Sequence, residues 1–360
     1  MENRTLEPSK FAAGLIVWYE KNKRDLPWRE TTDPYRIWLS EIILQQTRVQ
    51  QGLPYYYNFV TTYPTVASLA KADERDVLRL WQGLGYYSRA RNLHACAKKI
   101  VAEYQGSFPN NYQALLQLPG VGSYTAAAIA SFAYHENVAV LDGNVFRVLS
   151  RIFGIDEDIL SGRGRKVFER LAEQLISADD PATYNQAIME FGALHCTPKM
   201  PQCHECSFET SCVASQLQMQ HLLPVKISKV KVKKRYLHYI IVHHQEKIFM
   251  KERIGKDIWS GLYDFHAIEE TELHENFVPN DDFLNELVAN QAFLFEKSSN
   301  YKHVLTHQII HAKFYHYQLE DKKTAMSVTN KYGFGLYNSE EINLLPKPIL
   351  IVNYLNGRNF

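Results

Sequence analysis

The sequence lacks long apolar runs and a strong net charge, and each absence argues against a class of protein. No run of eighteen or more uncharged apolar residues occurs in the 360-residue chain, so a transmembrane helix is not expected. The first ten residues are polar and contain no apolar signal-peptide core, which predicts a cytoplasmic protein. With 40 basic and 39 acidic residues, the composition alone does not indicate a nucleic-acid partner.

The length and the hydrophobic periodicity predict two domains of different class. A chain of 360 residues is long for one compact domain. Residues 11–211 are predicted to form successive helices, because apolar residues recur at three- and four-residue spacing. From Tyr236 onward, strands are predicted at 236–244, 247–253, 259–268 and 311–319, with a closing helix at 346–355. We therefore expect an all-α domain followed by an α+β domain.

A basic stretch separates the two predicted domains. Residues 213–245 contain no acidic residue, and the basic positions lead into the first strand. These positions are Lys226, Lys229, Lys231, Lys233, Lys234 and Arg235. We place the first domain at 1–212, a basic linker at 213–235 and the second domain at 236–360. The linker is either a solvated tether or a tether that follows a phosphate backbone.

Four of the five cysteines lie in one short loop. Their spacing is Cys196-x6-Cys203-x2-Cys206-x5-Cys212, whereas Cys96 stands alone in a helical stretch and is expected to be a core thiol. A cytosolic protein rarely forms disulfides, so the loop predicts a metal centre, either a tetrahedral zinc or a cubane iron–sulfur cluster. Zinc ribbons usually contain two Cys-x2-Cys pairs, and only one pair here is that close.

This uneven cysteine spacing resembles the cluster loop of the endonuclease III superfamily of DNA repair enzymes. The resemblance implies a [4Fe–4S] cluster held by the four cysteines. Lys199 and His204 in the same loop are either phosphate contacts or simply exposed side chains.

Residues 118–133, LPGVGSYTAAAIASFA, predict two helices joined by a tight turn at Gly120 and Gly122. Glycines at such a turn let backbone amides at the next helix N-terminus face a phosphate oxygen. Asp142 follows Gly122 by twenty residues, in the segment VLDGNVFRVLSR. This arrangement resembles the helix-hairpin-helix DNA glycosylases, in which an essential aspartate follows the hairpin at about this distance.

The position of Tyr124 in the hairpin indicates which branch of those enzymes the sequence resembles. In the branch that also cleaves the DNA strand, a lysine at this position forms a Schiff base with the sugar. Tyrosine has no amine for that adduct. The resemblance therefore implies a monofunctional glycosylase without an efficient lyase step.

Glu41 lies within residues 35–47, YRIWLSEIILQQT, a helix predicted to be apolar almost all round. Burial among apolar neighbours disfavours an ionised carboxylate, so the proton would be held close to neutral pH, as a general acid requires. The alternative is a glutamate on the narrow polar edge of the helix.

The segments LPWRETTDPYRIWLSEIILQQTRV and WQGLGYYSRARNL resemble the MutY family of adenine DNA glycosylases. The resemblance implies hydrolysis of the N-glycosidic bond of adenine mispaired with 8-oxoguanine, or with guanine, in double-stranded DNA. We expect the enzyme to be a monomer. It implies that Glu41 and Asp142 are the catalytic pair. Further implied roles are support of Asp142 (Tyr124, Asn144), the adenine pocket (Trp28, Arg29) and contact with DNA or the lesion (Gln46, Thr47, Leu84, Tyr86, Gly120, Gly122).

The two carboxylates suit the chemistry of base removal. A base inside the duplex has to be flipped out before it can react. We hypothesise that neutral Glu41 protonates an adenine ring nitrogen while ionised Asp142 stabilises the oxocarbenium-like sugar.

The second domain resembles the Nudix-like domain of the same family. The segment KERIGKDIWSGLYDFHAIE resembles the opening of a Nudix fold, but residues 270–287 lack the R-E-x-x-E-E magnesium motif. We therefore expect a lesion-recognition module. Leu305, Thr306 and His307 match a Phe-Ser-His lesion loop, which implies that Thr306 and His307 contact the lesion. The four-residue spacing of His303, His307 and His311 is interpreted as one face of a strand, not as a metal site.

Three other functions compete with this interpretation. A bifunctional enzyme acting on oxidised pyrimidines would need the hairpin lysine. A non-catalytic cluster protein would not need Glu41 and Asp142 together, and a Nudix hydrolase would need the metal motif.

Overall fold

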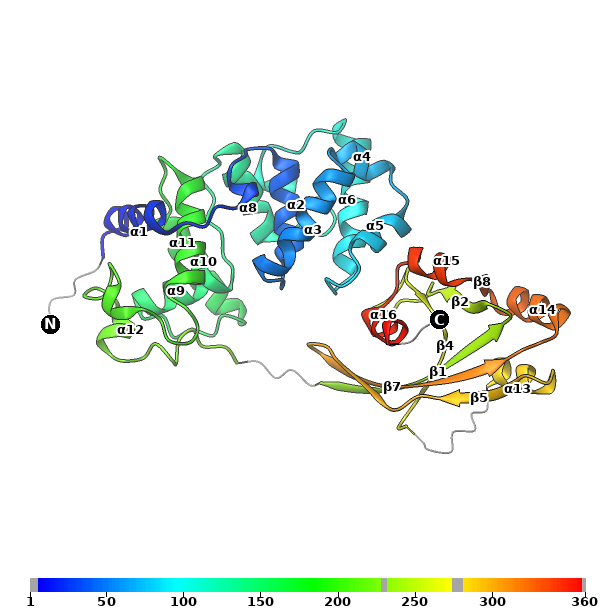
Figure 1. Cartoon of the computed structure of the whole chain (residues 1–360). Helices are drawn as coiled ribbons and strands as arrows, with labels where there is room; N and C mark the ends of the chain where they lie inside the picture. The colour runs from blue at the N-terminus through cyan, green and yellow to red at the C-terminus, as the bar shows by residue number, and fades with distance from the viewer. Residues whose placement is uncertain (1–5, 228–231, 274–280, 358–360) are drawn as a thin grey trace. The chain divides into compact units, whose positions relative to one another are not determined.

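The computed structural model describes residues 6–227, 232–273 and 281–357. It divides into two compact units, one formed by Met1–Lys71 and Asn92–Ser228 and the other by Ala72–Arg91 and Lys229–Phe360. Figure 1 shows helices throughout the blue-to-green half of the chain and a sheet in the yellow-to-red part. The predicted change from helices to strands is therefore confirmed.

Helices make up the described chain up to residue 227. In chain order they are α1 (Pro8–Asn22), the 3-10 helix η1 (Pro27–Arg29), α2 (Pro34–Leu44), α3 (Val49–Thr62), α4 (Val66–Lys71), α5 (Glu74–Leu80), α6 (Ser88–Tyr104), α7 (Tyr112–Leu115), α8 (Ser123–Tyr134), α9 (Gly143–Phe153), α10 (Gly162–Leu175), α11 (Pro181–Leu194), the 3-10 helix η2 (Cys203–Glu205) and α12 (Val213–Gln216). Helix α11 packs against α1, α8 and α9, and α2 packs against α8 and α3. The helices α2, α8, α9 and α11 therefore form one connected group in the first unit.

Helices α7 and α8 are joined by the predicted tight turn. Gly120 has a φ of +74°, and a Cβ atom there would lie 2.6 Å from Cβ of Asn92, so the turn requires glycine. Gly122 is the N-cap of α8, and no side chain caps this helix. Cys96 in α6 is fully buried, which confirms that it is a core thiol.

The second unit is built on a mixed eight-stranded sheet. Its strands are β1 (Lys233–His244), β2 (Lys247–Glu252), β3 (Tyr263–Asp264), β4 (His266–Glu270), β5 (Phe293–Lys297), β6 (Tyr301–Val304), β7 (Gln308–Gln318) and β8 (Gly335–Tyr337). The main order is β3-β2-β1-β7-β5, while β4 pairs with β1, β6 with β7 and β8 with β2. The strands predicted at 236–244 and 247–253 are confirmed as the antiparallel neighbours β1 and β2, and β1 runs parallel to β7.

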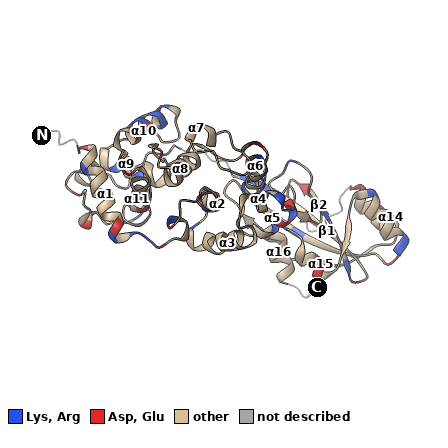
Figure 2. Ribbon diagram, turned by 90° about the horizontal axis from the view of Figure 1, so that it is seen from above, with Lys and Arg blue, Asp and Glu red and all other residues tan. Residues whose placement is uncertain are grey.

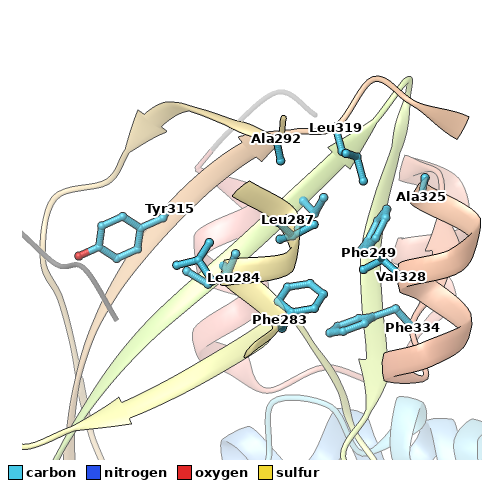
Figure 3. Packing of buried hydrophobic residues seen from close by; sticks show 12 residues of the cluster. Phe249, Phe283, Leu284, Leu287, Ala292, Tyr315, Leu319, Ala325, Val328 and Phe334 are labelled. Atoms are coloured by element: carbon cyan, nitrogen blue, oxygen red, sulfur yellow. The ribbon is translucent and has the colours of Figure 1, made fainter. Parts of the chain in front are cut away.

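The described part of the chain after β4 contains the helices α13 (Asp282–Ala289), α14 (Lys322–Tyr332), α15 (Ser339–Leu344) and α16 (Ile349–Asn356), and α5 belongs to the same unit. Figure 3 shows the apolar cluster in which Phe283 and Leu287 of α13 lie between the sheet and α14. On the opposite face of the sheet, Tyr354 of α16 stacks on Phe314 with ring centroids 3.6 Å apart. The predicted closing helix is thus confirmed as α16.

Two predictions about this part of the chain are wrong. The strand predicted at 259–268 begins only at Tyr263. The residues before it, 255–262, form bends and turns, and Gly261 among them has a φ of +82°. The three histidines do not share one strand. His303 lies in β6, His307 in the turn and His311 in β7, because the chain reverses after Val304.

The charges of the chain are spread over many elements. Figure 2 shows lysine and arginine on helices and strands of both units, consistent with the small net charge. Lys229 and Lys231 of the predicted linker lie outside the described residues. None of the helices in the described ranges is long and apolar enough to cross a membrane.

Candidate active site

A cavity of about 530 Å³ opens in the first unit between η1, α2, α8, α9 and α11. Its lining includes polar groups from elements that are far apart in the sequence. Seven of the predicted site residues line it: Trp28, Arg29, Glu41, Thr47, Tyr124, Asp142 and Asn144. The fold therefore brings both predicted catalytic carboxylates to one cavity.

Glu41 lies in the buried part of α2. Its side chain is only 7% exposed, so the alternative of a glutamate on an exposed polar edge is wrong. The pKa of Glu41 is raised to about 7, chiefly by burial; the hydrogen bond from Tyr124 opposes this shift, and the charge of Asp142 adds to it. Glu41 is therefore a carboxyl group that can hold a proton near neutral pH.

Tyr124 lies in the first turn of α8 and contacts Glu41 directly. Its hydroxyl donates a hydrogen bond to Oε2 of Glu41 over 2.7 Å and lies 3.7 Å from Sδ of Met189. Burial and the nearby carboxylates raise the pKa of Tyr124 well above its usual value. The hydroxyl consequently stays a donor to Oε2, so a proton held by Glu41 would lie on Oε1.

Asp142 is the N-cap of α9. Its Oδ1 accepts hydrogen bonds from the backbone N–H groups of Asn144 and Val145, both at 2.8 Å, and Oδ2 accepts from Nδ2 of Asn144 at 2.7 Å. Burial raises the pKa of Asp142 above its usual value, although these hydrogen bonds and the charge of Arg147 oppose the shift. Among the described residues no such set of N–H donors contacts Glu41, so Asp142 is the carboxyl group whose ionised form is stabilised by N–H donors.

Glu190 of α11 is a lining residue that the sequence reasoning missed. It is 1% exposed and accepts paired hydrogen bonds from the guanidinium groups of Arg24 and Arg29. Burial raises the pKa of Glu190, but the arginine hydrogen bonds outweigh it and bring the value to about 2. This ionised carboxylate fixes Arg29 at the cavity wall.

Arg147, also missed, connects the cap of α9 to the cysteine loop. Its guanidinium donates to Oδ1 of Asn144 over 2.8 Å, to the Gly192 carbonyl over 2.6 Å and to the Cys196 carbonyl over 2.8 Å. One turn later, Arg151 donates to the Thr197 carbonyl over 2.7 Å and lies 3.5 Å from Sγ of Cys196. Residues of one helix thus contact both the cavity and the loop.

The four cysteines of the loop border one hollow in the first unit. None of them forms a disulfide. The pKa of the Cys206 thiol is raised to about 12, chiefly by burial and to a smaller extent by the other three cysteines nearby. Within the described ranges, no three His, Cys, Asp or Glu residues form a group suited to a single metal ion.

The remaining predicted contact residues lie outside the cavity. In the first unit, Gln46 is exposed with a φ of +55°, and Gly120 and Gly122 form the α7–α8 turn. In the second unit, Leu84 is only 6% exposed, and the hydroxyl of Tyr86 hydrogen-bonds to Oγ1 of Thr306. That unit also holds exposed His307, in the β6–β7 turn.

Comparisons with known proteins agree with this organisation. Residues 39–178 match the HhH-GPD superfamily of base excision DNA repair proteins, and residues 238–357 match the NUDIX domain. A solved structure of a thermostable thymine-DNA glycosylase is similar with a TM-score of 0.54 and 29% identity, covering 58% of this chain and 97% of that one. The predicted combination of an all-α glycosylase domain and a Nudix-like α+β domain is confirmed.

Whole-chain relatives define the family. The adenine DNA glycosylase of Buchnera aphidicola subsp. Schizaphis graminum is 30% identical over 347 residues, which are 94% of this chain and 96% of that one. The human adenine DNA glycosylase is 43% identical over 226 residues, which are 60% of this chain and 41% of that one. The chain therefore belongs to the adenine DNA glycosylase family of base excision DNA repair enzymes.

Proposed function

We propose that the chain hydrolyses the N-glycosidic bond of adenine mispaired with 8-oxoguanine, or with guanine, in duplex DNA. The observation that carries this proposal is the pair of carboxyl groups in one cavity, a buried Glu41 with a pKa of about 7 and an Asp142 held by three N–H donors. Breaking a glycosidic bond needs a proton for the leaving group and a negative charge beside the sugar. The two environments supply one carboxyl group for each task.

The reaction begins when adenine is flipped out of the duplex into the cavity. Oε1 of protonated Glu41 gives its proton to a ring nitrogen, while the Tyr124 hydroxyl stays bonded to Oε2. As the bond between sugar and base lengthens, ionised Asp142 stabilises the positive charge that develops on the sugar. Glu41, now a carboxylate, then helps to activate water, which completes hydrolysis.

The walls of the cavity support the binding of a planar base. Trp28 contributes an aromatic side chain, and Arg29 is fixed by Glu190. Tyr124 occupies the position of the lyase lysine and offers a neutral hydroxyl in place of an amine. We therefore propose a monofunctional glycosylase that acts as a monomer and leaves an intact strand at an abasic site.

The opposite base is proposed to be read by the turn between β6 and β7. Thr306 offers a hydroxyl there, already hydrogen-bonded to Tyr86, and His307 is exposed beside it. Single-turnover rates of adenine release should be compared on duplexes with 8-oxoguanine, guanine or thymine opposite the adenine. We expect rates in that descending order, and equal rates on all three would overturn the specificity for oxidised guanine.

The excision rate is expected to fall as the pH rises through about 7. The folded-state pKa of Glu41 is raised to about 7, so its protonated, proton-donating form is present below that pH and is lost above it. Single-turnover rates measured from about pH 5 to pH 9 check this. A rate that keeps rising to pH 9 would exclude Glu41 as the acid.

We also propose that Cys196, Cys203, Cys206 and Cys212 hold a [4Fe–4S] cluster. The four thiols border one hollow and are free of disulfides, which fits a group with four cysteine ligands. A bound cluster would fix the loop on which Arg147 and Arg151 rest. It supplies no group to the proposed hydrolysis.

The purified chain is expected to contain about four iron and four sulfide ions per molecule, and Cys203→Ser is expected to lose most of them. Elemental analysis after anaerobic purification measures both quantities. About one zinc ion per chain and no sulfide would show a zinc site instead.

A Nudix hydrolase activity is not proposed for the second unit. The residues after β4 lack the spaced glutamates that bind magnesium in that family, although 274–280 lie outside the described residues. We propose that this unit recognises the lesion. A pyrophosphatase assay with magnesium should give no product above background.

A further inference from the structure

One face of the second unit's sheet is covered at one end and open at the other. At the covered end, Ile240 of β1 and Tyr315 of β7 pack in the cluster that contains α13 and α14. The open end lies toward the β6–β7 turn and begins four residues earlier in each strand, at Tyr236 and His311, since His238 on the same face is still fully buried. Side chains two residues apart in a strand point to the same face, so its composition follows from the register.

The open end forms a grid of side chains on β6, β7, β1 and β4. One row pairs Lys302, His311, Tyr236 and Glu270 across the four strands. The next row, nearer the turn, pairs Val304, Ile309 and Lys234. Tyr236 and His311 stack with ring centroids 5.1 Å apart and ring planes 16° apart. The aromatic pair therefore has Lys302 on one side and Glu270 on the other, and Lys234 lies in the adjacent row.

The exposure of this grid is unusual for the middle of a sheet. Lys234 and Lys302 are exposed, Val304 is 64% exposed, and Tyr236 and His311 are only half-buried. On the opposite face of β7, Ala312 and Phe314 are fully buried. The grid is therefore a surface that the described helices leave uncovered.

The two rows of the grid carry Lys234 and Lys302 and one carboxylate, Glu270, so their charge is positive. Lys234, Lys302 and Lys313 on this face form no ion pair with any residue in the described ranges, and Glu270 is the one carboxylate in the rows just defined. By contrast, Arg235 on the other face of β1 pairs with Glu269 and Asp257. Positive charge beside stacked aromatic rings fits a nucleic acid, since phosphates bind lysine and bases or sugars pack on rings.

The position of the grid connects it to the proposed lesion contact. The turn that carries Thr306 and His307 lies next to the second row of the grid, which consists of Val304, Ile309 and Lys234. The backbone N–H of Lys233 donates to the His307 carbonyl over 3.0 Å, so the start of β1 is fixed beside the turn. A duplex that meets this turn would extend its sugar–phosphate backbone along an adjoining surface, and the open face offers the exposed Lys234 and Lys302.

We propose that this open face of β1, β6 and β7 is a second DNA-binding surface, which holds the sugar–phosphate backbone through Lys234 and Lys302. The inference rests on the proposed function, because it takes the duplex to lie at the Thr306–His307 turn. It adds a sequence-independent contact to that turn.

The test uses the full chain with its cofactor and an undamaged duplex, so that backbone binding is measured without excision. Lys234→Ala/Lys302→Ala is expected to raise Kd about tenfold at 100 mM salt. It is also expected to reduce the slope of log K against log salt by about 1.8, which is about 0.9 for each lost phosphate contact. The matched control is Lys322→Ala/Lys323→Ala, which removes two exposed lysines at the start of α14. It should change neither quantity.

Two further measurements separate the possible outcomes. Lys234→Arg/Lys302→Arg should restore the slope of log K against log salt. A purely structural loss in the alanine variant would not predict this recovery. If the alanine variant binds like the α14 control, the inference is overturned whether or not the chain excises adenine. If wild-type chain releases no adenine but the slopes differ as expected, the proposed function fails and the DNA surface stands.

Discussion

Glu41→Gln is expected to lower the single-turnover rate of adenine release about 1,000-fold or more while the chain still binds the duplex. The amide has nearly the shape of the carboxyl group and can still accept the Tyr124 hydrogen bond, but it cannot donate an acidic proton. Rate and Kd are measured on the same duplex carrying adenine opposite 8-oxoguanine. Glu103→Gln, on the exposed end of α6, is the control and should keep the wild-type rate.

The same substitution is expected to increase stability at alkaline pH. The folded-state pKa of Glu41 is raised from about 4.5 to about 7, so its contribution to stability is complete below pH 4.5 and is lost as the pH rises through 7. The amide does not ionise. Urea unfolding at about pH 4.5 and pH 8 should therefore show the advantage of the variant growing by up to about 3 kcal/mol. An advantage independent of pH, or a rate within tenfold of wild type, would remove Glu41 from its assigned role.

Asp142→Asn is expected to reduce adenine release about 1,000-fold or more with little change in stability. Asparagine caps helices about as well as aspartate, so the bonds from the N–H groups of Asn144 and Val145 can remain. What is lost is the negative charge beside the developing sugar cation. Single-turnover kinetics and thermal unfolding measure the two effects separately.

The matched control for this variant is Asp180→Asn, which changes the N-cap of α11 in the same unit. It should leave the rate unchanged and shift stability by less than about 1 kcal/mol, as should Asp142→Asn. A slow Asp142→Asn variant that is also several kcal/mol less stable would indicate a structural role for the carboxylate. An Asp142→Asn rate close to wild type would contradict the proposed mechanism.

The sequence predicted those features that depend on residues close together in the chain. Glu41 stands among apolar residues of one helix, so its burial could be foreseen from a short segment. The α7–α8 turn was likewise predictable, because Gly120 adopts a conformation that few other residues tolerate. Both features depend on residues within about one helical turn or one loop.

Contacts between distant segments could not be predicted in the same way. Glu190 binds Arg29 from 161 positions away, and Arg147 reaches the Cys196 carbonyl across 49. A single sequence does not show which distant residue a charged side chain will pair with. The wrong strand at 259–262 has a related cause, since an apolar segment that includes Trp259 is buried within a turn and not in a ladder.

The central claim is that this chain releases adenine by hydrolysis without cutting the strand. The most direct test is a single-turnover reaction, with chain in excess over a duplex carrying one adenine opposite 8-oxoguanine, analysed before and after alkali. We predict free adenine and an intact strand that breaks only after alkali. Failure to release adenine, or direct strand scission with a borohydride-trapped covalent complex, would contradict it.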